Sequence, residues 1–242
     1  MATPWWNGEF AAFDTETTGK NPEEARIVTA CLARVGADGT VKDSWEMLIN
    51  PGVPIDPKAT EVHGISDEMA ADGLDPASAL QGLVAALDGA LTANIPLVIY
   101  NARFDLTTLD RDCRRNGIPT LEERTAGVLA PILDPYIMDK AVDTYRRGSR
   151  KLGDVCTLYG VSLEGWHNAA ADAVAAAQLA RTLIKRYRGL QIPLSTLHTA
   201  QQTWARQQAN SFERYLRNKT GDAGVTIDGS WPMTPHPVPV TA

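Results

Sequence analysis

Apolar and polar positions along the chain follow two periods, which together predict a mixed α/β domain. Short apolar runs bounded by polar loops predict strands at 10–14, 27–35, 41–50, 95–102 and 131–140. Apolar residues at helical spacing predict helices at 77–91, 103–117, 151–161, 169–188 and 194–221. Three strands come first and helices then alternate with strands, so we expect a mixed sheet flanked by helices.

Two stretches depart from both periods. Residues 51–73 are rich in Pro and Gly and predict a long, ordered connection. Residues 222–242 form a Pro-rich tail, which we expect to be extended or poorly ordered, with Trp231 packed onto the domain. We therefore expect a domain over 1–187, a helical extension over 188–221 and this tail.

The stretch AAFDTETTG places two acids at the end of the first apolar run. Successive side chains of a strand point to opposite faces, so Asp14 and Glu16 stand side by side on one face. Two neighbouring carboxylates repel each other, and burying them without a partner is costly. The pattern predicts a positive group between them.

Other acids follow at later structural junctions. Asp105 comes after the apolar run at 95–102, and Asp172 lies in the first turns of the Ala-rich helix. His167 lies five residues before Asp172, too far for both to share one helix face, so we place it on the preceding loop facing the same cleft. Oxygen-only ligands favour Mg²⁺ or Mn²⁺ over zinc, and a histidine titrating near neutrality suits a general base.

Composition restricts the class of protein. The chain of 242 residues is 44% hydrophobic and 21% charged, which is ordinary for a globular protein. Cys31, Cys113 and Cys156 are widely spaced and odd in number, which fits a reduced interior better than disulfides or a zinc site. The first residues do not resemble a signal peptide, and no apolar run approaches bilayer length, so we expect a cytoplasmic protein without a membrane partner.

The net charge of −6 is unevenly distributed. Residues 1–184 carry 16 Lys and Arg against 26 Asp and Glu, whereas residues 185–219 carry seven against one. Further basic clusters occur at 111–115 and at 146–151. Such patches can hold a phosphate backbone on an acidic protein, although solvated helix faces would give the same pattern.

FDTETTG, NARFD and HNAAAD, in this order, resemble the three motifs of the DEDDh (DnaQ-like) 3′–5′ exonuclease superfamily, which includes the proofreading subunit of bacterial DNA polymerase III. The resemblance covers roughly residues 8–187. It implies an RNase H-like fold, two divalent metal ions (Mg²⁺ or Mn²⁺), and release of nucleoside 5′-monophosphates from a 3′ end. By motif matching it assigns the metal ligands to Asp14, Glu16, Asp105 and Asp172, and the general base to His167.

Six further residues are candidates for contacts with the substrate: Thr15, Thr17, Thr18, His63, Asn101 and Phe104. The threonines could instead form a turn, the histidine could bond within its loop, and the phenylalanine could belong to the core. Asn101 could orient the neighbouring segment. Tyr100 precedes it where many members of the superfamily have a histidine.

Three functions compete. The leading one is a DNA exonuclease for proofreading or repair, acting on nucleic acid with a free 3′ end. An exoribonuclease would differ by a contact with the 2′-hydroxyl. A non-catalytic polymerase accessory or nucleic-acid binder is disfavoured, since a binder gains nothing from clustered acids near phosphates. QIPLSTL, Gln191 to Leu197, faintly resembles sliding-clamp-binding peptides, so a polymerase or a clamp is a candidate partner.

Overall fold

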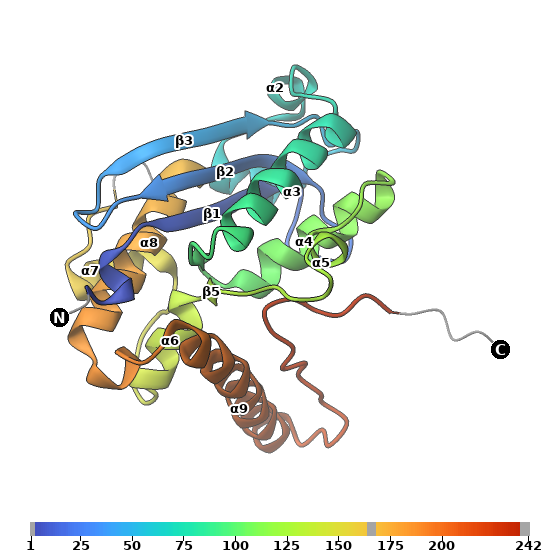
Figure 1. Ribbon diagram of the computed structural model, residues 1–242. Helices are drawn as coiled ribbons and strands as arrows, with labels where there is room; N and C mark the ends of the chain where they lie inside the picture. The colour runs from blue at the N-terminus through green and yellow to red at the C-terminus, as the bar shows by residue number, and fades with distance from the viewer. Residues whose placement is uncertain (1–2, 164–167, 238–242) are drawn as a thin grey trace.

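A five-stranded mixed sheet lies at the centre of the molecule, with strand order β3–β2–β1–β4–β5 (Figure 1). The computed structural model describes residues 3–163 and 168–237. The strands are β1 Phe10–Thr17, β2 Ile27–Val35, β3 Val41–Leu48, β4 Leu97–Val98 and β5 Ile132–Leu133. Strands β1 to β3 pair antiparallel, whereas β4 and β5 run parallel to β1. The mixed sheet expected from the order of elements is confirmed.

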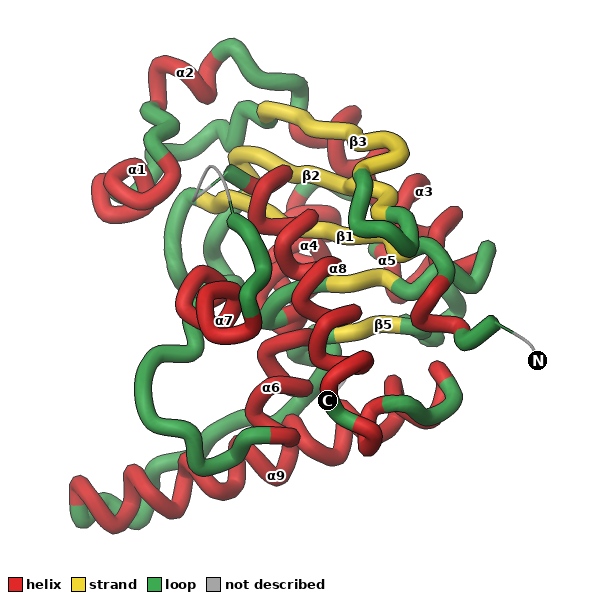
Figure 2. The backbone as a smooth tube through the Cα atoms, turned by 90° about the vertical axis from the view of Figure 1, so that its left-hand side faces the viewer, coloured by secondary structure: helices red, strands yellow, loops and turns green. Residues whose placement is uncertain are grey.

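Helices cover both faces of this sheet (Figure 2). The α-helices are α1 Pro57–His63, α2 Asp67–Ala71, α3 Pro76–Thr92, α4 Ala102–Arg115, α5 Leu121–Arg124, α6 Pro135–Val142, α7 Leu152–Tyr159, α8 Ala169–Arg186 and α9 Leu194–Thr220. Two 3₁₀ turns are η1 Trp5–Asn7 and η2 Arg188–Leu190. Helices α7 and α8 lie on one face, α3 and α4 lie on the other, and α9 runs along the β5 edge.

Strand β1 separates two hydrophobic cores because its side chains alternate between the faces. Phe10 and Ala12 pack with the residues of α8, whereas Ala11 and Phe13 pack with those of α3 and α4. The same alternation continues past the core. It directs Asp14 toward α8, on the face where the amino end of that helix lies.

The strand predicted at 131–140 is wrong over most of its length. Only Ile132–Leu133 is a strand, and the helix α6 begins at Pro135. The side chain of Asp134 accepts hydrogen bonds from the backbone nitrogens of Tyr136 (3.0 Å) and Ile137 (3.4 Å), and proline is favoured at the first helical position. This cap ends the strand after two residues.

The strand predicted at 95–102 is also shorter, and the first strand is longer, than expected. Only Leu97–Val98 is a strand, because Asn101 adopts a left-handed conformation (φ 62°) and α4 begins at Ala102. Strand β1 continues to Thr17 rather than ending at Asp14. The connection at 51–73 contains α1 and α2 and is ordered, as expected.

Helix α9 is joined to the sheet through side chains that reach the backbone of β5. His198 accepts a hydrogen bond from the nitrogen of Ile132 (3.1 Å). Gln201 accepts from the nitrogen of Asp134 (2.7 Å) and donates to the oxygen of Ile132 (3.0 Å). These bonds satisfy backbone groups at the edge of the sheet. The helical extension therefore packs as part of the same body as the sheet.

Residues 221–237, called here the C-terminal arm, contain no helix or strand yet pack along α4 (Figure 1). Trp231 and Met233 are buried in the core, as expected for the tryptophan. Three residues of α4, spaced four apart and so on one helix face, hold the arm. Thr107 accepts from the nitrogen of Thr234 (2.9 Å), Arg111 donates to the oxygens of Thr234 and Pro235 (3.1 Å each), and Arg103 bonds Asp228.

Candidate active site

Three carboxylates from two elements meet at one end of the sheet. Asp14 and Glu16 come from β1, and Asp172 comes from the first turn of α8. One oxygen from each lies within 4.8 Å of the others. The side chain of Asn168 fixes the start of α8 by accepting from the nitrogens of Ala170 (2.9 Å) and Ala171 (3.3 Å). The cap and the strand alternation thus bring the acids together.

Asp105 joins these acids from the other face of β1. It lies in the first turn of α4 and accepts hydrogen bonds from the nitrogen (3.1 Å) and the hydroxyl (2.6 Å) of Thr15. Asp105, Asp14, Glu16 and Asp172 all line one hollow of about 370 Å³, called here the carboxylate hollow. All four predicted ligands therefore face the same space.

Burial and mutual repulsion raise the proton affinity of this cluster. Burial raises the pKa of Glu16 to about 7, and the charges of Asp172 and Asp105 add to the shift. Burial also raises the pKa of Asp105 to about 7, although its hydrogen bonds with Thr15 oppose the change. The pKa of Asp14 lies well above its usual range because of burial and then of its three acidic neighbours. A divalent cation would offset this repulsion, and a donor set of carboxylate oxygens fits Mg²⁺ or Mn²⁺.

Several residues of the carboxylate hollow carry no signal in the sequence motifs. Tyr136, Arg150 and Lys151 line it beside the acids. The hydroxyl of Tyr100 donates to the backbone oxygen of Arg150 (2.7 Å), which ties this loop to the end of β4. The basic run at 146–151 is the feature of the sequence that indicates cationic side chains near the carboxylate hollow.

The basic clusters of the sequence have mainly structural partners. Arg146 and Arg150 both bind the buried carboxylate of Asp139 (2.6 and 2.5 Å). Arg111 binds Glu23 (2.7 Å) and Asp110 (2.6 Å) in addition to the arm. These arginines anchor loops, so the cluster at 111–115 gives little support to a nucleic-acid patch.

The predicted substrate contacts fall into two groups. Asn101 and Phe104 line the carboxylate hollow, and Thr15 lies inside it, bonded to Asp105. The hydroxyls of Thr17 and Thr18 bond within the β1–β2 connection, the first to the oxygen of Gly19 (2.8 Å) and the second to the nitrogen of Arg26 (3.0 Å). That is the turn-forming role considered from the sequence.

The two predicted histidines differ in how far they can be placed. His63 ends α1 and lines an adjoining hollow together with Glu16. Its Nδ1 accepts from the nitrogen of Ile65 (3.1 Å), which is the loop hydrogen bond considered as an alternative. His167, the expected general base, lies outside the described residues.

Asp134 is a residue that the motifs did not indicate and that organises the start of α4. Its buried carboxylate accepts from the backbone nitrogens of Asn101 (2.9 Å) and Ala102 (3.0 Å) and from Nε1 of Trp231 (3.1 Å). It therefore joins β5, the first turn of α4 and the arm. The Asp-Pro pair at 134–135, a typical helix start, was the available signal.

The segment 191–197, which resembles a clamp-binding peptide, is built into the fold. Leu197 is fully buried, and the oxygen of Ile192 accepts from Nε1 of Trp5 (2.8 Å). Clamp binding would require the segment to leave these partners.

With this fold and this cluster of acids, the chain belongs to the exonuclease family described by the model RNase_T, which matches residues 11–180. Its relatives include the DNA polymerase III subunit epsilon of Pasteurella multocida, which is 29% identical over 66% of this chain and 62% of the relative. The PolC-type DNA polymerase III of Lacticaseibacillus paracasei is 27% identical over 74% of this chain. The expected similarity to the DEDDh superfamily is confirmed.

Solved structures show the same fold. The structure of E. coli exonuclease I in complex with a dT13 oligonucleotide aligns with a TM-score of 0.61 and 19% identity, over 76% of this chain and 42% of that one. The match with the PolC-type polymerase spans only 11% of that relative's length. Within residues 3–163 and 168–237, no helix is both long and apolar enough to cross a membrane.

Proposed function

We propose that this chain is a metal-dependent 3′–5′ exonuclease that releases nucleoside 5′-monophosphates from the 3′ ends of DNA. The observation that carries the proposal is the meeting of Asp14, Glu16 and Asp172 within 4.8 Å, with Asp105 in the same hollow. Membership of the exonuclease family supports it, as do relatives named as a DNA polymerase III and as its subunit epsilon.

The four acids would hold two divalent cations in this proposal. Bound there, such cations lower the pKa of an attacking water and offset the negative charge that develops on the phosphate. Thr15 supports the arrangement by fixing the carboxylate of Asp105 against β1. The resemblance assigns removal of the water's proton to His167.

The remaining side chains of the hollow would bind and orient the substrate. Lys151, which is exposed beside the acids, supplies positive charge near the scissile phosphate. Phe104 offers a ring on which the terminal base can pack. Asn101, held in its left-handed conformation by Asp134, sets the edge of the space that the nucleotide enters.

The test uses one strand of DNA labelled at its 5′ end and the same strand labelled at its 3′ end. The proposal expects a ladder of shortened 5′-labelled products, immediate loss of the 3′ label as a mononucleotide, and no reaction in EDTA. A matched RNA strand examines the exoribonuclease alternative. Degradation from the 5′ end, or hydrolysis that EDTA does not stop, contradicts the proposal.

The role in the cell that best fits the relatives is proofreading or repair, with a DNA polymerase as partner. The epsilon and PolC relatives are named as polymerase components, and this chain shares only part of their length. A pull-down of purified replicative polymerase by the immobilised chain tests the association directly. A sliding clamp is the less favoured partner, since segment 191–197 is packed into the domain.

A further inference from the structure

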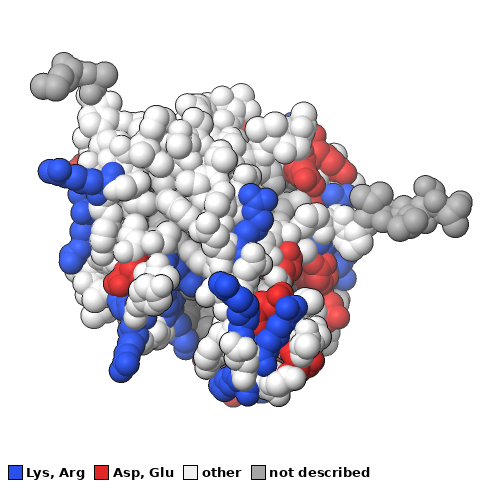
Figure 3. Space-filling model, turned by 90° about the horizontal axis from the view of Figure 1, so that it is seen from below, with Lys and Arg blue, Asp and Glu red and all other residues white. Residues whose placement is uncertain are grey.

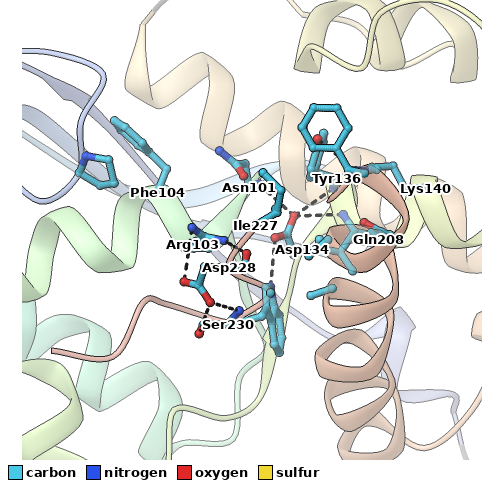
Figure 4. A pocket seen from close by; sticks show the side chains of 17 residues that line it. Asn101, Arg103, Phe104, Asp134, Tyr136, Lys140, Gln208, Ile227, Asp228 and Ser230 are labelled. Atoms are coloured by element: carbon cyan, nitrogen blue, oxygen red, sulfur yellow. Dashed lines mark hydrogen bonds and ion pairs between the residues drawn. The ribbon is translucent and has the colours of Figure 1, made fainter. Parts of the chain in front are cut away.

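A second hollow, of about 320 Å³, opens beside the carboxylate hollow, between α4, α6, α9 and the arm (Figure 4). Asn101, Phe104 and Tyr136 line both hollows, so the two adjoin. A third hollow, of about 410 Å³, lies over α9 and shares Lys140 and Phe212 with the second. We call the second and third hollows together the α9 groove.

Helix α9 presents different side chains to the arm and to this groove. Toward the arm, Glu213 accepts from the nitrogen of Ile227 (3.0 Å), and Arg217 donates to the oxygen of Val225 (2.8 Å). Toward the groove it presents Trp204, Phe212 and Tyr215, which follow helical spacing. The arm thus bonds one face of α9, whereas the third hollow, which Trp204, Phe212 and Tyr215 line, has no arm residue in its lining.

The aromatic face of α9 carries a pair of rings that are accessible to solvent. Phe212 is 49% exposed and Tyr215 is 54% exposed. Their planes are 15° from parallel and their centroids are 6.2 Å apart. Exposed rings of this kind are costly in water, and they offer flat surfaces to another planar group.

Cations accompany these rings. The Nζ of Lys140 lies 4.8 Å from the ring centroid of Tyr136, and the Nζ of Lys219 lies 5.7 Å from that of Tyr215. Figure 3, a view from the side on which α9 lies, shows further Lys and Arg side chains on the same face, with Asp and Glu side chains among them. Rings interleaved with cations along a groove are the arrangement by which proteins bind single-stranded nucleic acid.

We propose that the α9 groove binds the single-stranded segment that leads to the 3′ end in the carboxylate hollow. Unstacked bases lie on the rings of Phe212 and Tyr215, and phosphates lie against Lys140 and Lys219. In a duplex the base faces are already stacked, so these rings select single strands. The inference rests on the proposed function, since its occupant is the substrate's own strand. The rings of Phe212 and Tyr215 that carry it lie beyond the matched range 11–180.

Binding is tested without hydrolysis, in EDTA, by the fluorescence anisotropy of a 5′-labelled oligothymidylate. Phe212→Ala and Tyr215→Ala should each weaken binding by about tenfold, the effect of one lost stacking contact. Phe212→Tyr keeps the ring and should bind like the unmodified chain. A duplex of the same length should bind more weakly, with no dependence on Phe212.

The cations are tested by salt titration of the same binding. Lys140→Ala and Lys219→Ala should each reduce the slope of log K against log salt by about 0.7. Arg214→Ala is the matched control. Arg214 and Lys219 both lie on α9 outside the lining of the two hollows, but it is Lys219 whose Nζ contacts the ring of Tyr215 (5.7 Å), so Arg214→Ala should leave the slope unchanged. Equal effects of Arg214→Ala and Lys219→Ala would overturn the assignment of the cations.

Thermal melts establish that each variant folds, which is expected because the rings are half exposed. The proposal for the α9 groove is contradicted if Phe212→Ala binds the single strand as tightly as the unmodified chain does. It is also contradicted if the duplex binds as tightly as the single strand. If the unmodified chain hydrolyses 3′ ends but Phe212→Ala binds DNA normally, only the proposal for the α9 groove is contradicted. If binding of the single strand depends on the rings but no divalent cation supports hydrolysis, only the proposed exonuclease function is contradicted.

Discussion

The charge of Asp14 is disfavoured by burial and by three neighbouring acids, Asp105, Asp172 and Glu16. In the metal-free protein each such charge costs free energy, because no cation balances it. The same carboxylates that would bind the cations therefore lower the stability of the metal-free chain.

Asp14→Asn tests this conflict. The variant should lose nuclease activity, because one oxygen ligand is replaced by a neutral amide. Its melting temperature in EDTA should equal or exceed that of the unmodified chain, because a repelling charge is gone. Glu24→Gln, which changes an exposed acid of the β1–β2 connection, is the control that should change neither quantity. Full activity in Asp14→Asn would contradict the site.

The pH dependence of stability gives a second test. The pKa values of Glu16 and Asp105 rise to about 7 on folding, so the folded chain binds protons more tightly than the unfolded chain. The free energy of unfolding in EDTA should therefore fall as pH rises from about 4 to about 7. Urea unfolding of Glu16→Gln should show a smaller fall over this range. An equal fall in both proteins would show that Glu16 does not titrate there.

At the scale of elements, α4 depends on a part of the chain far away in sequence. Asp134 holds its first turn, and the arm covers its outer face through Arg103, Thr107 and Arg111. Asp105, a candidate metal ligand, lies in that first turn. We therefore expect the arm to help position this carboxylate through α4.

Trp231→Phe tests this support, since it keeps a large ring and removes the Nε1–H donor to Asp134. Loss of the hydrogen bond to a buried acid should destabilise the chain by about 1–3 kcal/mol. Displacement of α4 should also raise the Mg²⁺ concentration needed for half-maximal activity. Met233→Leu, a volume-conserving change in the same arm, should leave that concentration unchanged. A loss of stability with no change in Mg²⁺ requirement would limit the arm to a structural role.

The sequence predicted the elements with strong periodicity and missed those decided by caps. Helices α8 and α9 and strands β2 and β3 have long repeating patterns and lie close to their predicted ranges. The strand predicted at 131–140 is mostly wrong because apolar residues in this stretch suit a strand or a buried helix equally. The cap at Asp134 decides in favour of the helix. Motif order indicated the four acids. It could not indicate Tyr136 or the arm, because their place near the site depends on tertiary packing.

The described residues pack as one body, although the uneven distribution of charge along the sequence predicts a separate C-terminal extension. Residues 188–221 carry the basic segment, yet Leu197, His198 and Gln201 are buried against β5. The boundaries expected at 187 and 221 therefore mark changes in composition within a continuous packing. They stay predictions as domain limits.

Truncation after residue 187 tests the unity of the molecule. It removes the buried side chains of α9 and exposes the edge of β5, so it should cost more than about 4 kcal/mol of stability. A chain ending at residue 220 keeps α9 and should lose less. Calorimetry should show one transition for the full chain. Two separate transitions, or a stable fragment 1–187, would contradict a single body.

The arm also has a consequence in time. Its contacts with α4 join residues 123 to 131 positions apart. At synthesis rates of about 5–20 residues per second, α4 emerges roughly 6–25 s before the segment that covers it. During that interval one face of α4 is exposed to water. Asp134 precedes Trp231 by 97 positions, so it lacks the donor from Trp231 for about 5–19 s. A growing chain therefore lacks the arm's hydrogen bonds to α4, the helix that carries Asp105, until the arm has been made.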